Sequence, residues 1–215
     1  MDIREIFVTH KHIDHLMGII WMVRMICQFM RHGEYQGEAR IYGHEEVIFL
    51  IKDMANKLLL EQETKFIGNR LHLIAVSDGE EHMINGRKVT FFDICSSKTK
   101  QFGFGMELDN GEKLTCCGDE PYNSSEEKYV KNSKWLLHEA FCLYSQVDIF
   151  DPYEKHHSTV KDACELAENL GVQNMILYHT EDKNIHIRKK LYMEEGKKYY
   201  SGNLYILEDL ETIEI

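Results

Sequence analysis

The chain has 215 residues, of which 43% are hydrophobic and 28% are charged, as in ordinary globular proteins. Acidic residues outnumber basic ones by 36 to 25, and the resulting net charge of −11 argues against a general nucleic-acid-binding surface. The chain has only two prolines and shows no repeat, linker or low-complexity segment, so we expect a single domain over residues 1–215.

The first third of the chain predicts a short strand followed by helices. Ile3 to Thr9 is a β-branched and aromatic run, which is typical of a strand. Leu16 to Met30 is apolar nearly all round and predicts a buried helix, too short and too interrupted to span a bilayer. A second short strand is expected at Ala39 to Gly43. From His44 to about Leu60, apolar residues recur at helical spacing.

From Leu71 onward the pattern alternates with a period of two, which predicts strands. One strand is expected at Leu71 to Val76, and two hairpins follow it. Asn85-Gly86 in the first hairpin is a tight-turn sequence. The hairpin strands are expected at His82 to Ile84 with Val89 to Ile94, and at Phe102 to Leu108 with Lys113 to Cys117.

Strands and helices alternate in the last third of the chain. Ser158 is expected to cap a helix that ends at Leu170, before Gly171. The other expected elements are a short helix capped by Ser124 or Ser125, strands at Trp135 to Ala140, Met175 to Tyr178 and Asn203 to Leu207, a helix at Asn184 to Tyr199, and an edge strand at Glu208 to Glu214. This order predicts an α/β (α+β) fold of mixed sheets flanked by helices.

Four side chains of the kind that bind metals follow the first predicted strand within six positions: His10, His12, Asp14 and His15. In extended backbone the first three lean to one side, and His15 follows at the mouth of the predicted helix. Imidazole and carboxylate suit zinc or another divalent transition metal. One zinc rarely takes four ligands from six residues, so we expect two ions, with His10 and His12 on one and Asp14 and His15 on the other.

Further ligands must then come from other strand ends. Asp119 follows a predicted strand and could bridge two metals, although an aspartate in a loop is often a turn former. His179 ends another strand and could be a terminal ligand. His138-Glu139 ends a third.

These motifs together resemble the metallo-β-lactamase superfamily, and within it ribonuclease Z and its phosphodiesterase relatives. The resemblance is carried by Phe7 to Gly18, Cys117-Gly118-Asp119, His138 to Phe141, His157-Ser158-Thr159 and His179, which occur in the family's order. It implies an αββα sandwich and two divalent ions, zinc or alternatively manganese, bridged by Asp119. It also implies a metal-dependent hydrolase that activates water, with a phosphodiester as the substrate.

The resemblance also implies roles for single residues. Asp14 would bind metal and accept the proton of the attacking water, and His157 would stabilise the phosphate or protonate the leaving group. Glu139 would orient His157. The bland alternatives are a salt bridge at a strand end for Glu139 and a plain neighbour of a helix cap for His157.

The chain departs from the family pattern in three places. Where the family has a metal-binding histidine after the strand at Val89 to Ile94, this chain has Cys95, which either replaces that ligand or merely ends the strand. The first strands of the family domain precede the family motif but are missing here, so we expect a truncated domain whose open edge beside Ile3 to Thr9 is covered by a homodimer mate or another chain. No long Gly-Pro-rich arm is visible, which makes transfer RNA a less favoured substrate.

Two alternative functions stay open at this point. The chain could hydrolyse another ester, a thioester or a lactam, or it could be a truncated, non-catalytic member of the superfamily. The start of the chain lacks the apolar segment of a signal peptide, and its six cysteines form no CxxC pair, so we expect a cytoplasmic protein with no membrane partner.

Overall fold

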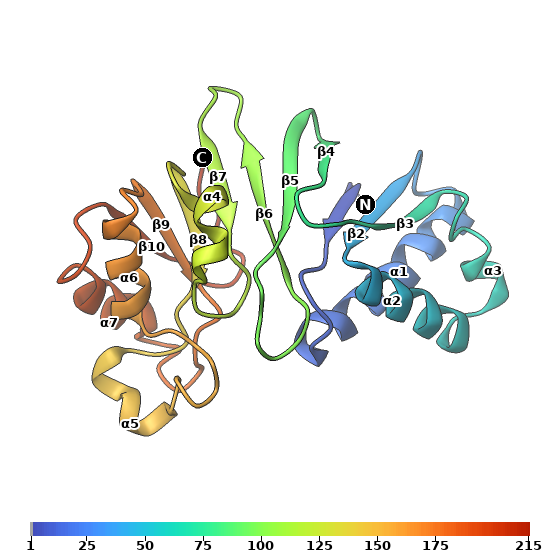
Figure 1. The fold of residues 1–215 in the computed structure, drawn as a ribbon. Helices are drawn as coiled ribbons and strands as arrows, with labels where there is room; N and C mark the ends of the chain where they lie inside the picture. Colours follow the sequence, from blue (N-terminus) through green and yellow to red (C-terminus); the bar gives the residue numbers. More distant parts are fainter. Residues whose placement is uncertain (1) are drawn as a thin grey trace.

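Two β-sheets form the centre of the computed structural model, which describes residues 2–215, and helices cover their outer faces (Figure 1). The first sheet has three parallel strands, β1 (Glu5–Phe7), β2 (Ala39–Gly43) and β3 (Leu71–Ala75), in that order. All three lie within the predicted segments. This αββα arrangement confirms the predicted fold class.

The second sheet has seven strands over the same described residues, in the order β10-β9-β8-β7-β6-β5-β4. Its strands β4 to β7 are antiparallel neighbours, which confirms both predicted hairpins, and β7 to β10 are parallel. The strands are β4 (Glu81–Ile84), β5 (Arg87–Asp93), β6 (Phe102–Glu107), β7 (Lys113–Cys116), β8 (Trp135–Glu139), β9 (Asn174–Tyr178) and β10 (Asn203–Ile206).

The helices fall into two groups. On the first sheet lie α1 (Ile13–His32), α2 (Glu45–Leu58) and the short α3 (Glu61–Thr64). The helices that follow β7 are α4 (Glu127–Val130), α5 (Val147–Phe150), α6 (Val160–Asn169) and α7 (Arg188–Gly196), with 3-10 turns η1 (Ser124–Glu126) and η2 (Tyr144–Gln146).

Helix α1 differs from its prediction in two ways. It begins at Ile13, three residues before the predicted start, so Asp14 and His15 lie in its first helical turn and not in extended backbone. It also buries only one face. Ile13, Met17 and Trp21 recur every four residues and are 76%, 51% and 60% exposed, so they form an apolar stripe on its outer side.

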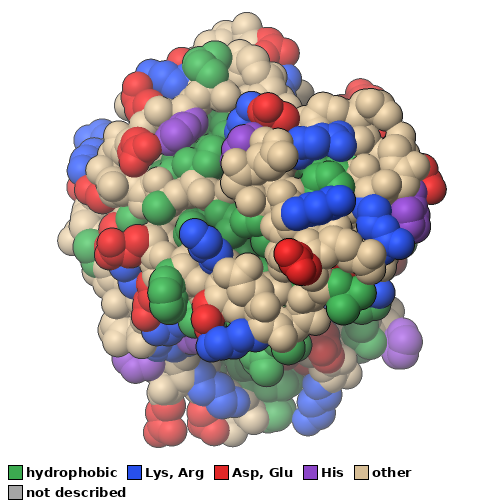
Figure 2. Space-filling model, turned by 90° about the vertical axis from the view of Figure 1, so that its right-hand side faces the viewer, with side chains coloured by type: hydrophobic (Ala, Val, Ile, Leu, Met, Phe, Trp, Pro, Cys, Tyr) green, Lys and Arg blue, Asp and Glu red, His purple; other side chains and the backbone are tan. Residues whose placement is uncertain are grey.

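The length of α1 corrects the expectation that this helix is too short to span a bilayer. With 20 residues and its apolar composition, the helix is long enough to cross a membrane by those two criteria alone. However, seven of its side chains are buried in the core against the first sheet and α2, which accounts for the composition. Figure 2 shows the side of the protein that carries α1, α2 and α3, where hydrophobic side chains lie between scattered charged ones.

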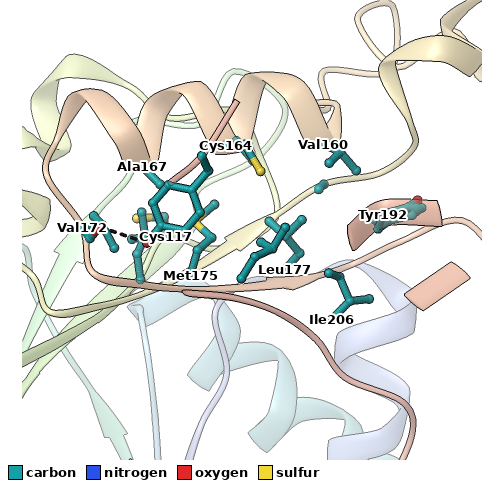
Figure 3. Close-up of a cluster of buried hydrophobic side chains, with 14 of the residues drawn as sticks. Cys117, Val160, Cys164, Ala167, Val172, Met175, Leu177, Tyr192 and Ile206 are labelled. Carbon is teal, nitrogen blue, oxygen red and sulfur yellow. Dashed lines mark hydrogen bonds between the residues drawn. The ribbon is translucent and has the colours of Figure 1, made fainter. Parts of the chain in front are cut away.

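Separate apolar clusters hold the layers together. Phe7 and Tyr42 of the first sheet pack against Phe91 of the second, which joins the two sheets. On the outer face of the second sheet, Cys164 of α6 packs over Met175 of β9 (Figure 3). Burial of such side chains stabilises the layers by about 1.5–3 kcal/mol for each large apolar residue.

Local hydrogen bonds correct three predicted boundaries in the last third. Thr159, not Ser158, caps α6, because its hydroxyl accepts a hydrogen bond from the backbone N–H of Asp162. The carboxylate of Asp162 in turn accepts one from the backbone N–H of Thr159. Helix α7 begins at Arg188 and not at Asn184, whose amide groups bond to the side chain of Glu181 instead. Within the described chain, residues 208–214 form a turn and coil, not an edge strand.

A similar correction applies to η1. Its cap is Asn123, whose side chain accepts from the N–H of Ser125, and neither Ser124 nor Ser125 takes that role. Gly171 confirms its predicted place after α6, because its φ of 66° is the left-handed conformation that glycine adopts readily.

Candidate metal centre

The site forms where the carboxyl ends of three strands meet, at the lower edge of the sheets in Figure 1. The segment after β1 carries His10 and His12 and runs into the first turn of α1 with Asp14 and His15. Asp119 follows β7, and His179 follows β9. The structure therefore brings together ligand-type residues that are far apart in the sequence.

Converging ligand atoms form two groups that share His15: Asp14, His15 and His179 form one, and His10, His15 and Asp119 form the other. His15 Nε2 lies 3.4 Å from Asp14 Oδ2 and 3.5 Å from Asp119 Oδ2. His179 Nε2 lies 3.9 Å from Asp14 Oδ2 and 3.5 Å from Asp119 Oδ2. Ligand atoms around a tetrahedral zinc, with bonds of about 2.0–2.1 Å, are about 3.3 Å apart. The spacing thus fits a divalent ion held by Asp14, His15 and His179, with the Asp119 carboxylate close to both histidines.

Unpartnered polar atoms support this fit. Asp119 is 3% exposed, and its Oδ1 has no hydrogen-bond partner among the described residues. His179 Nδ1 is also buried without a partner in that part of the chain. Buried polar groups normally find a partner, and a bound ion with its water is one way to supply it.

The imidazoles determine the electrostatics of the shared carboxylate. Burial acts to raise the pKa of Asp119, but hydrogen bonds and charges from His10, His15 and His179 outweigh it, so the pKa lies far below its usual range. Burial acts to lower the pKa of His15, but its hydrogen bond to Asp119 raises that pKa overall. Burial lowers the pKa of His179, which favours the neutral imidazole that binds metals.

The backbone before Asp119 is specific to this geometry. Gly118 has a φ of 75°, and a Cβ there would lie 2.3 Å from Gln101 Oε1. That amide oxygen, which is fully buried, accepts a 2.7 Å hydrogen bond from the backbone N–H of Asp119. Gly118 and Gln101 therefore hold the carboxylate in place, and the sequence offered no signal for Gln101.

The other end of the cluster contains His10 and His12. His10 Nε2 lies 3.3 Å from Asp119 Oδ2, and His10 Nδ1 bonds to the Thr9 hydroxyl at 2.9 Å, which fixes the ring orientation. His12 Nδ1 lies 2.8 Å from His10 Nε2, which is a direct hydrogen bond and shorter than the edge of a metal tetrahedron. Among residues 2–215, no group of three converging ligand atoms includes His12.

His157 and Glu139 lie beside the metal-binding group. The His157 ring is 5.0 Å from the His179 ring and stacks on Phe141 at 5.0 Å. His157 Nδ1 lies 3.7 Å from Glu139 Oε2, and Glu139 is fully buried, with its Oε1 accepting from the backbone N–H of Ser158. At this distance the two atoms form no hydrogen bond, but the carboxylate is close enough to stabilise a protonated imidazole.

Cys95 is not brought to the cluster. It is exposed, its φ is 56°, and it belongs to no group of converging ligand atoms in the described chain. The same loop instead directs Lys98 at the site, with Nζ 3.3 Å from His157 Nε2. Sequence reasoning missed Lys98, because neither its type nor its spacing marks a lysine as part of a metal centre.

Comparisons with known proteins agree on the fold. A family model described as the beta-lactamase superfamily domain matches residues 1–180. Ribonuclease Z of Archaeoglobus fulgidus is 24% identical over the whole of this chain and 81% of its own length. The metallo-beta-lactamase fold protein YhfI of Bacillus subtilis has a TM-score of 0.74 at 18% identity, over 95% of this chain and 75% of its own. The short form of human tRNase Z has a TM-score of 0.68 at 19% identity, over 98% of this chain and 78% of its own.

Proposed function

The chain belongs to the beta-lactamase superfamily, and we propose that it is a metal-dependent hydrolase whose substrate is a phosphodiester. The observation that carries this proposal is the position of His157. Its imidazole lies beside the buried carboxylate of Glu139 and next to His179 of the Asp14–His15–His179 group, within reach of Lys98. An acid and a cation beside a metal centre suit a substrate that carries negative charge and releases an alkoxide.

In the proposed centre, Asp14, His15 and His179 would hold one divalent ion, zinc or manganese, His10 and His12 would hold a second, and Asp119 would contribute to both. Such ions act as Lewis acids that polarise a phosphoryl oxygen and acidify water.

The chain's own residues perform the proton transfers. The Asp14 side chain is 60% exposed, so its carboxylate faces incoming water and can accept a proton from it. His157 delivers a proton from its ring to the leaving oxygen, and Glu139 stabilises the imidazolium before that transfer.

We propose a small phosphodiester, not transfer RNA, as the natural substrate. The relatives are named for action on RNA, but the net charge of −11 argues against a general basic surface for a polynucleotide.

The test is a substrate panel with zinc- or manganese-loaded protein. Bis-p-nitrophenyl phosphate is expected to be hydrolysed, while aryl esters, thioesters and lactams serve as the alternatives and chelator-treated protein as the control. Hydrolysis of an ester, thioester or lactam alone would reject the phosphodiester. No metal-dependent turnover of any substrate would favour a non-catalytic member of the superfamily.

A homodimer through the free edge of the first sheet is a further part of the proposal. Among the described residues β1 pairs only with β2, and a cavity of about 350 Å³ beside it is lined by apolar side chains such as Ile6 and Met22 and also by His15 and Asp119 of the candidate site. A second copy would cover this edge and the exposed α1 stripe. Light scattering should show twice the 25.3 kDa chain mass, and Trp21→Lys should give a monomer of unchanged metal content. A wild-type monomer would reject the dimer.

We also propose that the protein is cytoplasmic. All six cysteines are free in the part of the chain that the structure describes, as expected in a reducing compartment. Fractionation of the native host would test this location.

A further inference from the structure

A third group of converging ligand atoms comprises Glu139, His157 and His179. It shares His179 with the Asp14–His15–His179 group, but the proposed centre gives it no ion, since Glu139 and His157 serve proton transfer there. Two imidazoles and one glutamate are a donor set that zinc takes in hydrolases. The type and the convergence of these side chains therefore fit a further zinc ion.

The gap between Glu139 and His157 has the width of a metal site and not that of a hydrogen bond. His157 Nδ1 lies 3.7 Å from Glu139 Oε2, which is too long for a hydrogen bond. In the Asp14–His15–His179 group, the corresponding distances from Asp14 Oδ2 are 3.4 Å and 3.9 Å. The His157 ring stacks on Phe141 at 5.0 Å, and this contact helps to keep the ring where it is.

Each of the three side chains has a buried polar atom without a hydrogen-bond partner among residues 2–215. These atoms are Glu139 Oε2, His157 Nδ1 and His179 Nδ1. Glu139 is fully buried, and its other oxygen accepts from the backbone N–H of Ser158. Buried polar atoms normally have partners, and a buried carboxylate is costly unless it is paired. A cation bound by this group would supply the missing interactions.

The opposite nitrogen of His157 faces a different neighbour. Lys98 Nζ lies 3.3 Å from His157 Nε2, so the ammonium does not occupy the Nδ1 side of the ring. With zinc on Nδ1, the neutral ring keeps its one proton on Nε2. The exposed Lys98 then turns toward solvent, because an ammonium cannot donate to an N–H. In this state the ring cannot become an imidazolium.

We propose that Glu139, His157 and His179 bind a further zinc ion when zinc is in excess, and that this ion inhibits the hydrolase by occupying the His157 nitrogen that faces Glu139. The inhibitory half rests on the proposed function, whereas the binding half does not. Because His179 is also a ligand in the proposed centre, the further ion binds more weakly than the ions there and is removed with excess metal. Manganese has a lower affinity than zinc for such a site and does not fill it.

The first experiment counts zinc and does not depend on activity. Protein that holds only the ions remaining after removal of excess metal is titrated with zinc in a calorimeter, and one more ion per chain is expected. Glu139→Gln keeps the shape of the side chain but removes its charge, and it should weaken binding of this ion at least about tenfold. Glu195→Gln is the matched control, because Glu195 is another buried carboxylate that accepts backbone N–H bonds, from Tyr144 and Ser145. It should bind zinc like the wild type.

The second experiment uses the wild type and so does not depend on the folding of a variant. In nitrogen NMR spectra of protein with labelled histidine, excess zinc should shift the Nδ1 signal of His157. The signals of His186, which is exposed, should stay unchanged. An unchanged His157 signal at saturating zinc would overturn the proposal.

The third experiment measures inhibition. Excess zinc should lower turnover of bis-p-nitrophenyl phosphate about 10²-fold, over the same concentrations that shift the His157 signal. Excess manganese should leave the manganese-loaded protein active. The residual turnover of Glu139→Gln should not respond to excess zinc, whereas Glu195→Gln should be inhibited like the wild type.

The outcomes separate this inference from the proposed function. A wild type that takes up no further zinc overturns the site, and so does a folded Glu139→Gln variant that binds the further ion with full affinity. Binding without inhibition overturns the inhibitory half. If no phosphodiester is hydrolysed but the further ion binds and Glu139→Gln weakens it, the proposed function fails while the cation site stands.

Discussion

The two sheets supply the metal centre in different ways. The three-stranded sheet contributes His10, His12, Asp14 and His15 from one short segment that follows β1. The seven-stranded sheet contributes Asp119 and His179 from two separate strand ends, each positioned by contacts with distant residues. The ligand-type residues of the three-stranded sheet are therefore close in sequence, whereas those of the seven-stranded sheet are brought together by tertiary packing.

This difference shows where the centre is vulnerable. Substitutions on the first sheet's segment remove single ligands, whereas Asp119 is the group that both layers share. Its Oδ2 lies within 3.3–3.5 Å of His10 and His15 from one sheet and of His179 from the other. The layers are thus joined at this carboxylate.

The largest effect is expected from Asp119→Asn, which removes the carboxylate shared by the two sheets. The amide keeps the size of the side chain but removes its charge, so tight metal binding should be lost and turnover should fall by about 10³-fold or more. Metal analysis and kinetics measure both. Asp109→Asn, at an exposed turn of the same sheet, is the control. A full metal content in Asp119→Asn would show that the sheets are not joined through this group.

His157→Ala is expected to have the next largest effect, and it acts on the second sheet's side alone. Removing the proton donor should lower turnover by about 10²- to 10⁴-fold without changing the metal content. His186→Ala, at an exposed position, is the control. Because Glu139, His157 and His179 also form a group of converging ligand atoms, loss of metal in His157→Ala would instead identify a ligand.

Metal removal tests whether the ion joins the layers. An ion present at 100 to 1,000 times its Kd stabilises the folded state by about 3–4 kcal/mol, which for a chain of this size raises Tm by about 5–15 °C. Thermal unfolding with and without a chelator measures the shift, and Asp119→Asn should show none. Equal Tm values for loaded and stripped wild-type protein would contradict a structural role of the ion.

The smallest effect concerns buried carboxylates, which also differ between the layers. Glu63 beside the first sheet lies 4.0 Å from Arg24, whereas Glu126 beside the second is fully buried without a cation partner in the described chain, and its pKa is raised to about 8, mainly by burial. The unfolded chain releases this proton near pH 4.5, so the stability that Glu126 contributes is complete below that pH and is lost as the pH rises toward 8.

Glu126→Gln should therefore weaken the decrease in stability between pH 5 and 8 by about 2–3 kcal/mol. Urea unfolding at several pH values measures this difference, with Glu63→Gln as the control. An unchanged pH dependence in Glu126→Gln would place the cause of the decrease elsewhere.

Most of the fold was predictable because its signals are local. The first hairpin follows from Asn85-Gly86, which adopt φ values of 50° and 78° as such a turn requires. The start of α1 was mispredicted because no Ser, Thr, Asp or Asn precedes Ile13 as a cap. The start of α7 was predicted too early, at Asn184, because the side chain of this residue bonds locally to Glu181 and does not begin the helix.

For the candidate metal centre too, the residues marked by local sequence were predictable and those placed by tertiary packing were not. His10 to His15 could be identified from their spacing, and Asp119 and His179 from their place after strands. Lys98 and Gln101 could not, because their contacts form only when the loop between β5 and β6 packs against Asp119 after β7 and against His157 before α6. No sequence pattern within one segment indicates that these segments pack against each other.

The shortness of β1 has a consequence for assembly symmetry. If two copies join β1 to β1 about a twofold axis, the contact is self-complementary and uses up both free edges, so growth stops at a pair. Joining β1 of one copy to β3, the opposite edge of the same sheet, would be head-to-tail and would propagate into an open filament. With only three residues, β1 offers few backbone groups for such a chain of copies. In the proposed dimer, the exposed side chains of α1 would then have to favour the closed pair.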